Sequence, residues 1–167
     1  MTKWYCSLPW TGFSNDPDGK VRPCCIYKDY IKDENNNPYY VQNTSVKEIF
    51  SSRYMQDLRQ QFREGLKPKG CETCIKDEGN GFRSKRQSYS TENIAYVEEP
   101  SLPVEYQMIL SNACNLKCRS CTPSHSSQWQ AEHKVLFGNT GYSMPHSQPG
   151  SQKSVLWAER KEWMQHL

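Results

Sequence analysis

The sequence predicts an α+β fold in two small parts: residues 1–100, a β-hairpin with helices, and residues 101–167, which begin with a strand, a loop and a helix. Three observations predict this division. A turn signal at 16–19 precedes a short extended segment, and apolar residues recur at helical spacing within 52–64. The segment 104–110, Val-Glu-Tyr-Gln-Met-Ile-Leu, then predicts a strand that leads directly into a cysteine-containing loop.

The first part takes its elements from local signals. The Asp-Pro-Asp-Gly turn at 16–19 and the segment 20–26 predict a hairpin that ends beside Cys24. Ser45 and Glu48 have the spacing of a capping box, which predicts a short helix through Phe50. A longer helix is expected over about 52–64. Its core positions, and the glycine that ends it, are Met55, Leu58, Phe62 and Gly65.

The second part follows a polar stretch. Residues 79–103 predict a loop, with the domain boundary near residue 100. The run 104–110 predicts a buried strand, and a helix is expected from Pro123 or Ser126 to Leu136. A linker over 138–153 and a final helix over 154–167 complete the chain.

Composition narrows the class of protein. Only 35% of the 167 residues are apolar. This low fraction limits the hydrophobic core and therefore favours stabilisation by a metal. The net charge of +3 comes without a dense basic stripe, so no nucleic-acid partner is expected. No apolar leader and no run of about 18 apolar residues occurs. The sequence therefore predicts a soluble, cytoplasmic protein with no membrane partner.

Eight cysteines stand out in a chain of this length. Four disulfides are one interpretation, but a reducing compartment and the tight spacing of Cys71 and Cys74 disfavour it. Three others, Cys114, Cys118 and Cys121, lie in a CxxxCxxC loop between the predicted strand and helix. Zinc takes four ligands, and the nearest fourth candidate is His125. A [4Fe–4S] cluster held by three thiolates keeps one iron open, and we favour it over zinc.

The stretch 110–121, Leu-Ser-Asn-Ala-Cys-Asn-Leu-Lys-Cys-Arg-Ser-Cys, resembles the radical S-adenosylmethionine superfamily. The resemblance implies that Cys114, Cys118 and Cys121 hold a [4Fe–4S] cluster after the first strand of a partial (β/α) barrel. It implies that the open iron binds S-adenosylmethionine, which is cleaved to a 5′-deoxyadenosyl radical. Ser120 takes the position beside the adenine, where the family often has an aromatic residue.

The other cysteines resemble a second family pattern. Cys6, the Gly19-x4-Cys24 spacing and the pair Cys71 and Cys74 resemble the SPASM and twitch auxiliary-cluster domains. The resemblance implies a second [4Fe–4S] cluster with these four ligands, and Cys25 is the alternative to Cys24. The twitch form is favoured because further cysteines are missing. A zinc site with four cysteine ligands is also compatible with this set.

The function predicted from these resemblances is hydrogen abstraction from a peptide or small molecule, with S-adenosylmethionine and a reductant such as a flavodoxin or ferredoxin as partners. The residues from Val104 onward are too few for six barrel strands, and the family's Gly-Gly-Glu segment is missing. We therefore expect an inactive or incomplete fragment of such an enzyme. The alternative is a non-catalytic zinc or iron–sulfur module that binds a partner.

Overall fold

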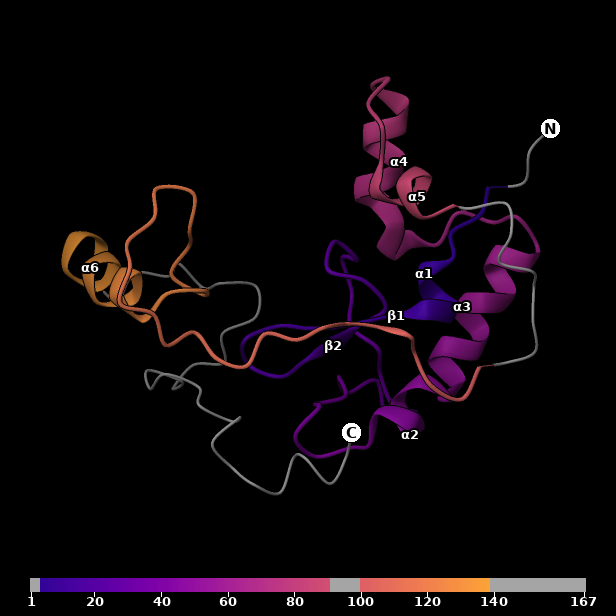
Figure 1. Ribbon diagram of the computed structural model, residues 1–167, viewed down its shortest axis with the longest axis horizontal. Coiled ribbons are helices and arrows are strands. Elements are labelled where there is room, and N and C mark those ends of the chain that lie inside the picture. The colour runs from indigo at the N-terminus through magenta and orange to yellow at the C-terminus, as the bar shows by residue number, and fades with distance from the viewer. Residues whose placement is uncertain (1–3, 91–99, 139–167) are drawn as a thin grey trace.

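The hairpin expected from the turn signal opens the fold in the computed structural model, which describes residues 4–90 and 100–138 (Figure 1). Strand β1 (Gly12–Asn15) pairs antiparallel with β2 (Val21–Arg22). The turn between them needs Gly19, whose φ of 87° lies in the left-handed region that favours glycine. The amide of Gly19 donates to the carbonyl of Asp16 over 2.8 Å and closes the turn.

A third strand, β3 (Glu105–Gln107), pairs with β1 in parallel and gives the sheet order β2-β1-β3. The Asn15 side chain anchors the segment just after β3, because it donates to the Ile109 carbonyl over 2.8 Å and accepts from the Ile109 amide over 3.3 Å. The strand prediction is confirmed, but the predicted burial is wrong: every residue of β3 is exposed. The reason is that β3 forms the edge of a small sheet.

The helices of the N-terminal module surround one apolar core. Their bounds are α1 (Leu8–Thr11), α2 (Val46–Phe50), α3 (Arg53–Arg63), η1 (Lys69–Cys71), α4 (Glu72–Gly79) and α5 (Lys85–Tyr89). As predicted, Ser45 caps α2 by accepting from the Glu48 amide, and α3 buries its three apolar positions. The buried core cluster draws all its members from residues 6–62. The apolar surface that holds this module together therefore lies N-terminal to α4.

Arg59 lies at the centre of this core with no exposed surface. Its guanidinium donates to the Pro9 carbonyl over 2.9 Å and to the Phe50 carbonyl over 2.8 Å. A buried charge needs such partners, because without them the loss of hydration would destabilise the fold. Arg59 thereby ties α3 to α1 and α2.

Helix α5 corrects the prediction of a loop over residues 79–103. Ser84 and Gln87 form a complete capping box at its start. The helix has five residues, none of them fully buried, so it shows no apolar periodicity that a sequence could reveal. Its cap and its tertiary contacts stabilise it instead.

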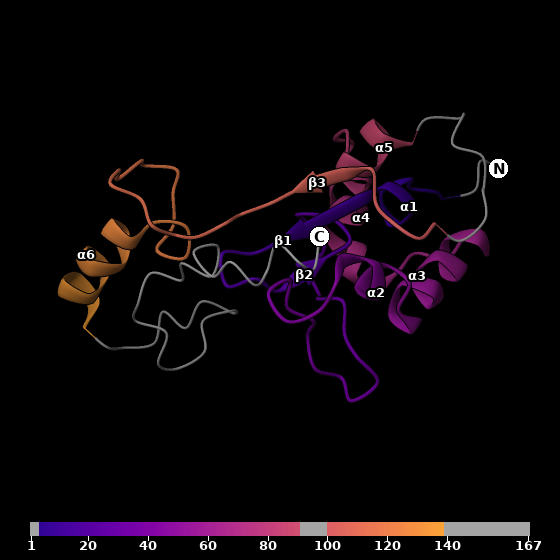
Figure 2. The same ribbon diagram turned by 60° about the horizontal axis from the view of Figure 1, so that its bottom comes forward.

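The C-terminal part of the described chain runs from β3 through the cysteine loop to α6 (Ser127–Phe137). Figures 1 and 2 both show this loop and helix set apart from the N-terminal module. The strand–loop–helix order is as predicted, but β3 pairs with the hairpin and no barrel unit is seen in these residues. No described helix is long and apolar enough to cross a membrane.

Some predictions lie beyond what the structure describes. The final helix over 154–167, and the linker apart from Gly138, fall outside the described residues. The domain boundary near residue 100 adjoins the undescribed stretch 91–99 and stays a prediction.

Candidate metal centre

Four cysteines from three separate segments line one small pocket of the N-terminal module. They are the four that spacing predicts as ligands: Cys6, Cys24, Cys71 and Cys74. The remaining wall is formed by Leu8, Ile26, Tyr27, Gly70, Lys85 and Arg86. Within residues 4–90 and 100–138, no group of three or more His, Cys, Asp or Glu side chains is arranged to hold a metal ion as it stands.

Local structure brings each cysteine to the pocket. Cys71 ends η1 and caps α4, so Cys74 follows three residues later on the same face of the helix. Cys24 follows β2 and accepts a hydrogen bond from the Tyr27 amide over 3.1 Å, which turns the chain. Cys6 lies next to Ser7, the N-cap residue of α1, and is buried.

Gly70 lets two of these segments meet. A Cβ atom at this position would overlap the ring of Tyr27, and the Lys28 amide donates to the Gly70 carbonyl over 2.9 Å. The segment that carries Cys71 therefore lies flat against the one that carries Cys24. The sequence did not reveal this role of Gly70, because a close approach between distant segments leaves no local signal.

Burial shapes the chemistry of these thiols. Burial, reinforced by the neighbouring thiols, raises the pKa of Cys6 to about 12. Burial likewise raises the pKa of Cys24 to about 11, and that of Cys71 is raised for the same first reason. Without a metal these thiols are protonated at neutral pH. Because a metal binds thiolates, its binding releases protons and is opposed by acid.

An ion pair between Arg86, in the pocket wall, and Glu78 of α4 supports the pocket. The guanidinium of Arg86 makes two hydrogen bonds to the Glu78 carboxylate, of 2.8 and 2.7 Å. It also donates to the Tyr5 carbonyl over 2.8 Å, next to Cys6. The hydrogen bonds from Arg86 hold the pKa of Glu78 below its usual value. Arg86 thereby joins the Cys6 segment to α4, a role that the sequence did not reveal.

Cys25 has a different position from Cys24. It does not line the pocket, and its Sγ lies 3.1 Å from the Nζ of Lys85. Although burial opposes it, the hydrogen bond with Cys25 raises the pKa of Lys85. The two adjacent cysteines thus face different surroundings.

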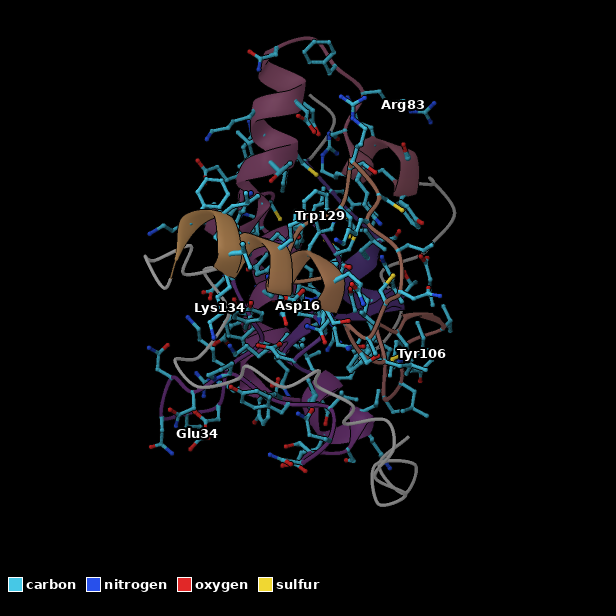
Figure 3. The ribbon with its side chains drawn as sticks, turned by 90° about the vertical axis from the view of Figure 1, so that its left-hand side faces the viewer. Asp16, Glu34, Arg83, Tyr106, Trp129 and Lys134 are labelled. Atoms are coloured by element: carbon cyan, nitrogen blue, oxygen red, sulfur yellow. The ribbon has the colours of Figure 1, made fainter. Side chains whose placement is uncertain are left out.

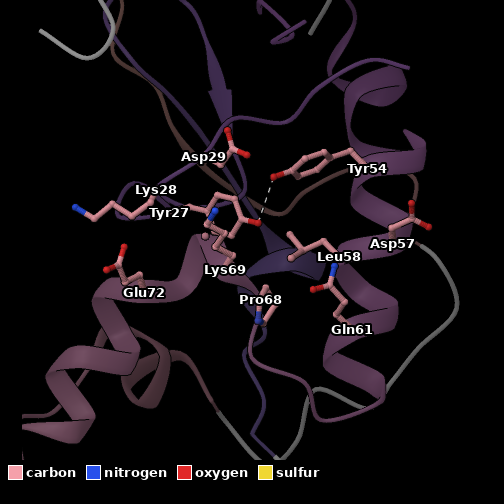
Figure 4. Close-up of a pocket in the computed structure, with 11 residues that line it drawn as sticks. Tyr27, Lys28, Asp29, Tyr54, Asp57, Leu58, Gln61, Pro68, Lys69 and Glu72 are labelled. Atoms are coloured by element: carbon pink, nitrogen blue, oxygen red, sulfur yellow. Dashed lines mark hydrogen bonds between the residues drawn. The ribbon is translucent and has the colours of Figure 1, made fainter. Parts of the chain in front are cut away.

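A larger, open cavity of about 550 Å³ shares Tyr27 and Gly70 with the cysteine pocket (Figure 4). The hydroxyls of Tyr27 and Tyr54 point toward one another in it and are 3.2 Å apart. Burial, followed by the neighbouring Tyr54, raises the pKa of Tyr27. Tyr27 therefore forms a neutral wall between this cavity and the four cysteines.

The C-terminal cysteine loop is held by its backbone. The Ser127 hydroxyl lies 3.3 Å from the Cys114 amide and 3.2 Å from the Cys114 carbonyl. The indole of Trp129 donates to the Cys118 carbonyl over 3.0 Å. Figure 3 looks from this end of the molecule and shows α6 in front, with Trp129 and Lys134 along it.

The three thiols of this loop stay partly open to solvent. Cys118 is exposed, while Cys114 and Cys121 are half-buried. Ser120 is exposed as well. The ring of His125 is engaged through Nδ1, which lies 2.7 Å from the Ser124 hydroxyl. The structure therefore anchors this loop to α6 and leaves its three thiols partly open to solvent.

Comparison with protein families gives one match, of residues 6–75 to SPASM, an iron–sulfur cluster-binding domain. The matched stretch begins at Cys6 and contains all four cysteines of the pocket. Comparisons with curated proteins and with solved structures found no match. Over residues 6–75 the chain is therefore similar to an iron–sulfur cluster-binding domain. More particularly, the match supports an auxiliary domain of the type found with radical S-adenosylmethionine enzymes, and the small mixed fold is compatible with it.

Proposed function

We propose that Cys6, Cys24, Cys71 and Cys74 hold an auxiliary [4Fe–4S] cluster. The observation that carries this proposal is that four cysteines from three distant segments line one pocket inside the matched stretch. Four thiolates complete the coordination of such a cluster, which suits electron transfer or structural support. Cys24 rather than Cys25 would be the ligand, because Cys24 lines the pocket and Cys25 does not.

The second part of the proposal concerns the C-terminal loop. Cys114, Cys118 and Cys121 would hold a second [4Fe–4S] cluster with one open iron, which binds the amino and carboxylate groups of S-adenosylmethionine. Such a cluster supplies the electron that cleaves this molecule to methionine and a 5′-deoxyadenosyl radical. The support is the cysteine spacing and the anchoring of the loop backbone by α6. Ser120 would lie beside the adenine.

The wider reaction follows from that cluster. The radical would abstract a hydrogen atom from a peptide or small-molecule substrate, and a flavodoxin or ferredoxin would supply the electron. A non-catalytic metal module that binds a partner is the second candidate. It is favoured by the partial exposure of Cys114, Cys118 and Cys121 to solvent, and a Cys₄ set in the first pocket equally suits zinc.

Metal analysis of variants at the neighbouring positions Cys24 and Cys25 tests the first site. The full chain is purified and reconstituted without oxygen, and its iron, sulfide and zinc are measured together with its visible absorption. We expect about eight irons per chain, four for each cluster. Cys24→Ala should lose about half of this iron and Cys25→Ala should keep all of it. Equal loss from both variants would contradict the ligand assignment, and zinc without iron would favour the second candidate.

A spectroscopic experiment tests the second site. S-adenosylmethionine should change the electron paramagnetic resonance spectrum of the reduced chain, because it binds an iron of the open cluster. Cys114→Ala should lose this response and keep the signal of the other cluster. Cys71→Ala should behave in the opposite way. A response that survives in Cys114→Ala would reject the proposed role of the loop.

A further inference from the structure

Helix α5 contributes to the wall of the cysteine pocket although it lies beyond the family match. The match ends at residue 75, and every wall residue except Lys85 and Arg86 falls within it. The pocket is therefore closed on one side by two cations from outside the matched domain. Their different partners suggest different roles.

The positive charge of Arg86 is balanced by the carboxylate of Glu78. Both oxygens of Glu78 accept hydrogen bonds from Arg86, and the two side chains form an ion pair of 2.7 Å. The guanidinium also donates a hydrogen bond to the Tyr5 carbonyl. Since the Glu78 carboxylate neutralises the guanidinium, Arg86 adds little net charge to the pocket and acts mainly as a clamp.

Lys85 is a cation without a carboxylate partner in the described part of the chain. Its Nζ contacts the Sγ of Cys25 at 3.1 Å and lies 5.2 Å from the centre of the Tyr89 ring. The side chain is half-buried at the pocket wall. Solvent therefore screens its charge less than that of a fully exposed lysine.

We infer that Lys85 tunes the cluster held by the four cysteines, by stabilising its reduced form and so raising its reduction potential. This inference rests on the proposed function. Reduction adds one electron and no proton, so the reduced cluster carries one more negative charge than the oxidised one. A nearby uncompensated cation stabilises the more negative state, and charge and hydrogen bonding around a cluster are known to set its potential. Cys25 positions Lys85 by holding its amine.

A redox titration of the full, reconstituted chain tests the role of Lys85. The cluster at the four cysteines is observed in a Cys114→Ala background, with dithionite as the reductant and electron paramagnetic resonance as the readout. At a fixed solution potential, Lys85→Gln should lower the ratio of reduced to oxidised cluster about tenfold, equivalent to about 59 mV for one electron. Lys85→Arg keeps the charge and should restore most of the ratio.

The matched control is Lys47→Gln, which removes the same charge from an exposed position on α2, at the far end of the module from α5 (Figure 1). This variant should leave the ratio unchanged. Equal ratios in Lys85→Gln and the parent would overturn the inference while leaving the proposed cluster intact. Loss of iron from Lys85→Gln would also overturn it, since Lys85 would then be needed for binding of the cluster rather than for its reduction potential. A parent chain that binds no iron would overturn both proposals.

Discussion

The two cysteine sets of this chain differ in how they are built. In the N-terminal module, Cys6, Cys24, Cys71 and Cys74 converge on one pocket from three segments. In the C-terminal loop, Cys114, Cys118 and Cys121 lie within eight consecutive residues and stay partly exposed. One site is created by tertiary packing, and the other is carried by a local stretch of chain. Perturbing the core should therefore damage the first site far more than the second.

The distribution of apolar surface explains the difference. Core members such as Val46 and Met55 have no exposed surface. By contrast, Val135 and Leu136 of α6 are 83% and 65% exposed. Because burial of apolar surface is the main source of stability, the N-terminal module has its own packed core, whereas α6 contributes little apolar burial within the described residues.

The largest expected effect comes from the core. Phe62 is 1% exposed and stacks on Trp4 with ring centres 5.5 Å apart. Phe62→Ala should lower the free energy of unfolding by about 3–5 kcal/mol. Leu136→Ala, at an exposed position on α6, should change it by less than about 0.5 kcal/mol. Urea unfolding of both variants checks the comparison, and similar effects would contradict it.

The next effect compares two ion pairs. Glu78 accepts from Arg86, Ser84 and Trp4 in a largely buried setting, so Glu78→Gln should destabilise by about 2–3 kcal/mol. The exposed pair of Lys117 and Glu132 spans 3.4 Å, and Glu132→Gln should change stability by less than about 1 kcal/mol. Thermal unfolding with iron analysis should show iron loss in Glu78→Gln alone. Equal retention of iron in both variants would contradict a supporting role of Arg86 at the pocket.

A smaller effect is expected at Gly70. Its added Cβ would overlap the Tyr27 ring, so Gly70→Ala should destabilise by about 1–2 kcal/mol and weaken iron binding. Gly79→Ala is the control, because nothing lies within 4 Å of its added Cβ. That change should be neutral or stabilising by up to about 1 kcal/mol, given the higher helix propensity of alanine. Tighter iron binding by Gly70→Ala would contradict the close approach.

The smallest effect is a pH dependence of the reduced, iron-free protein. Burial raises the pKa of Cys6 from 9.0 to about 12 and that of Cys24 from 9.0 to about 11. The unfolded chain therefore loses these protons first, and stability falls as pH rises above about 8.5 toward the folded pKa values. Between pH 7 and 9 the loss should be about 1 kcal/mol in total by linkage.

Urea unfolding at several pH values measures this dependence. A variant with Cys6 and Cys24 both changed to alanine should show a flatter profile. Stability that rises over the same pH interval would contradict the burial of these thiols. The iron-loaded protein should instead lose stability as the pH falls, because its cysteine ligands must remain deprotonated.

The sequence by itself determined the features that rest on short-range chemistry. The turn at Gly19, the cap at Ser45 and the apolar face of α3 follow from backbone preference, side-chain capping and helical periodicity. The cysteine spacing also selected the four residues that line the pocket. The turn, cap and helix signals lie within a few residues of the elements they define, whereas the cysteine pattern extends over residues 6–74.

Only the tertiary structure decided the features that depend on distant partners. It separated Cys24 at the pocket from Cys25 at Lys85, placed α5 in the wall, and paired β3 with β1 at an exposed edge. Arg86 reaches a carbonyl 81 positions away in the chain. Such contacts leave no local pattern, because burial and charge compensation depend on which segments pack together rather than on which residues are neighbours in sequence.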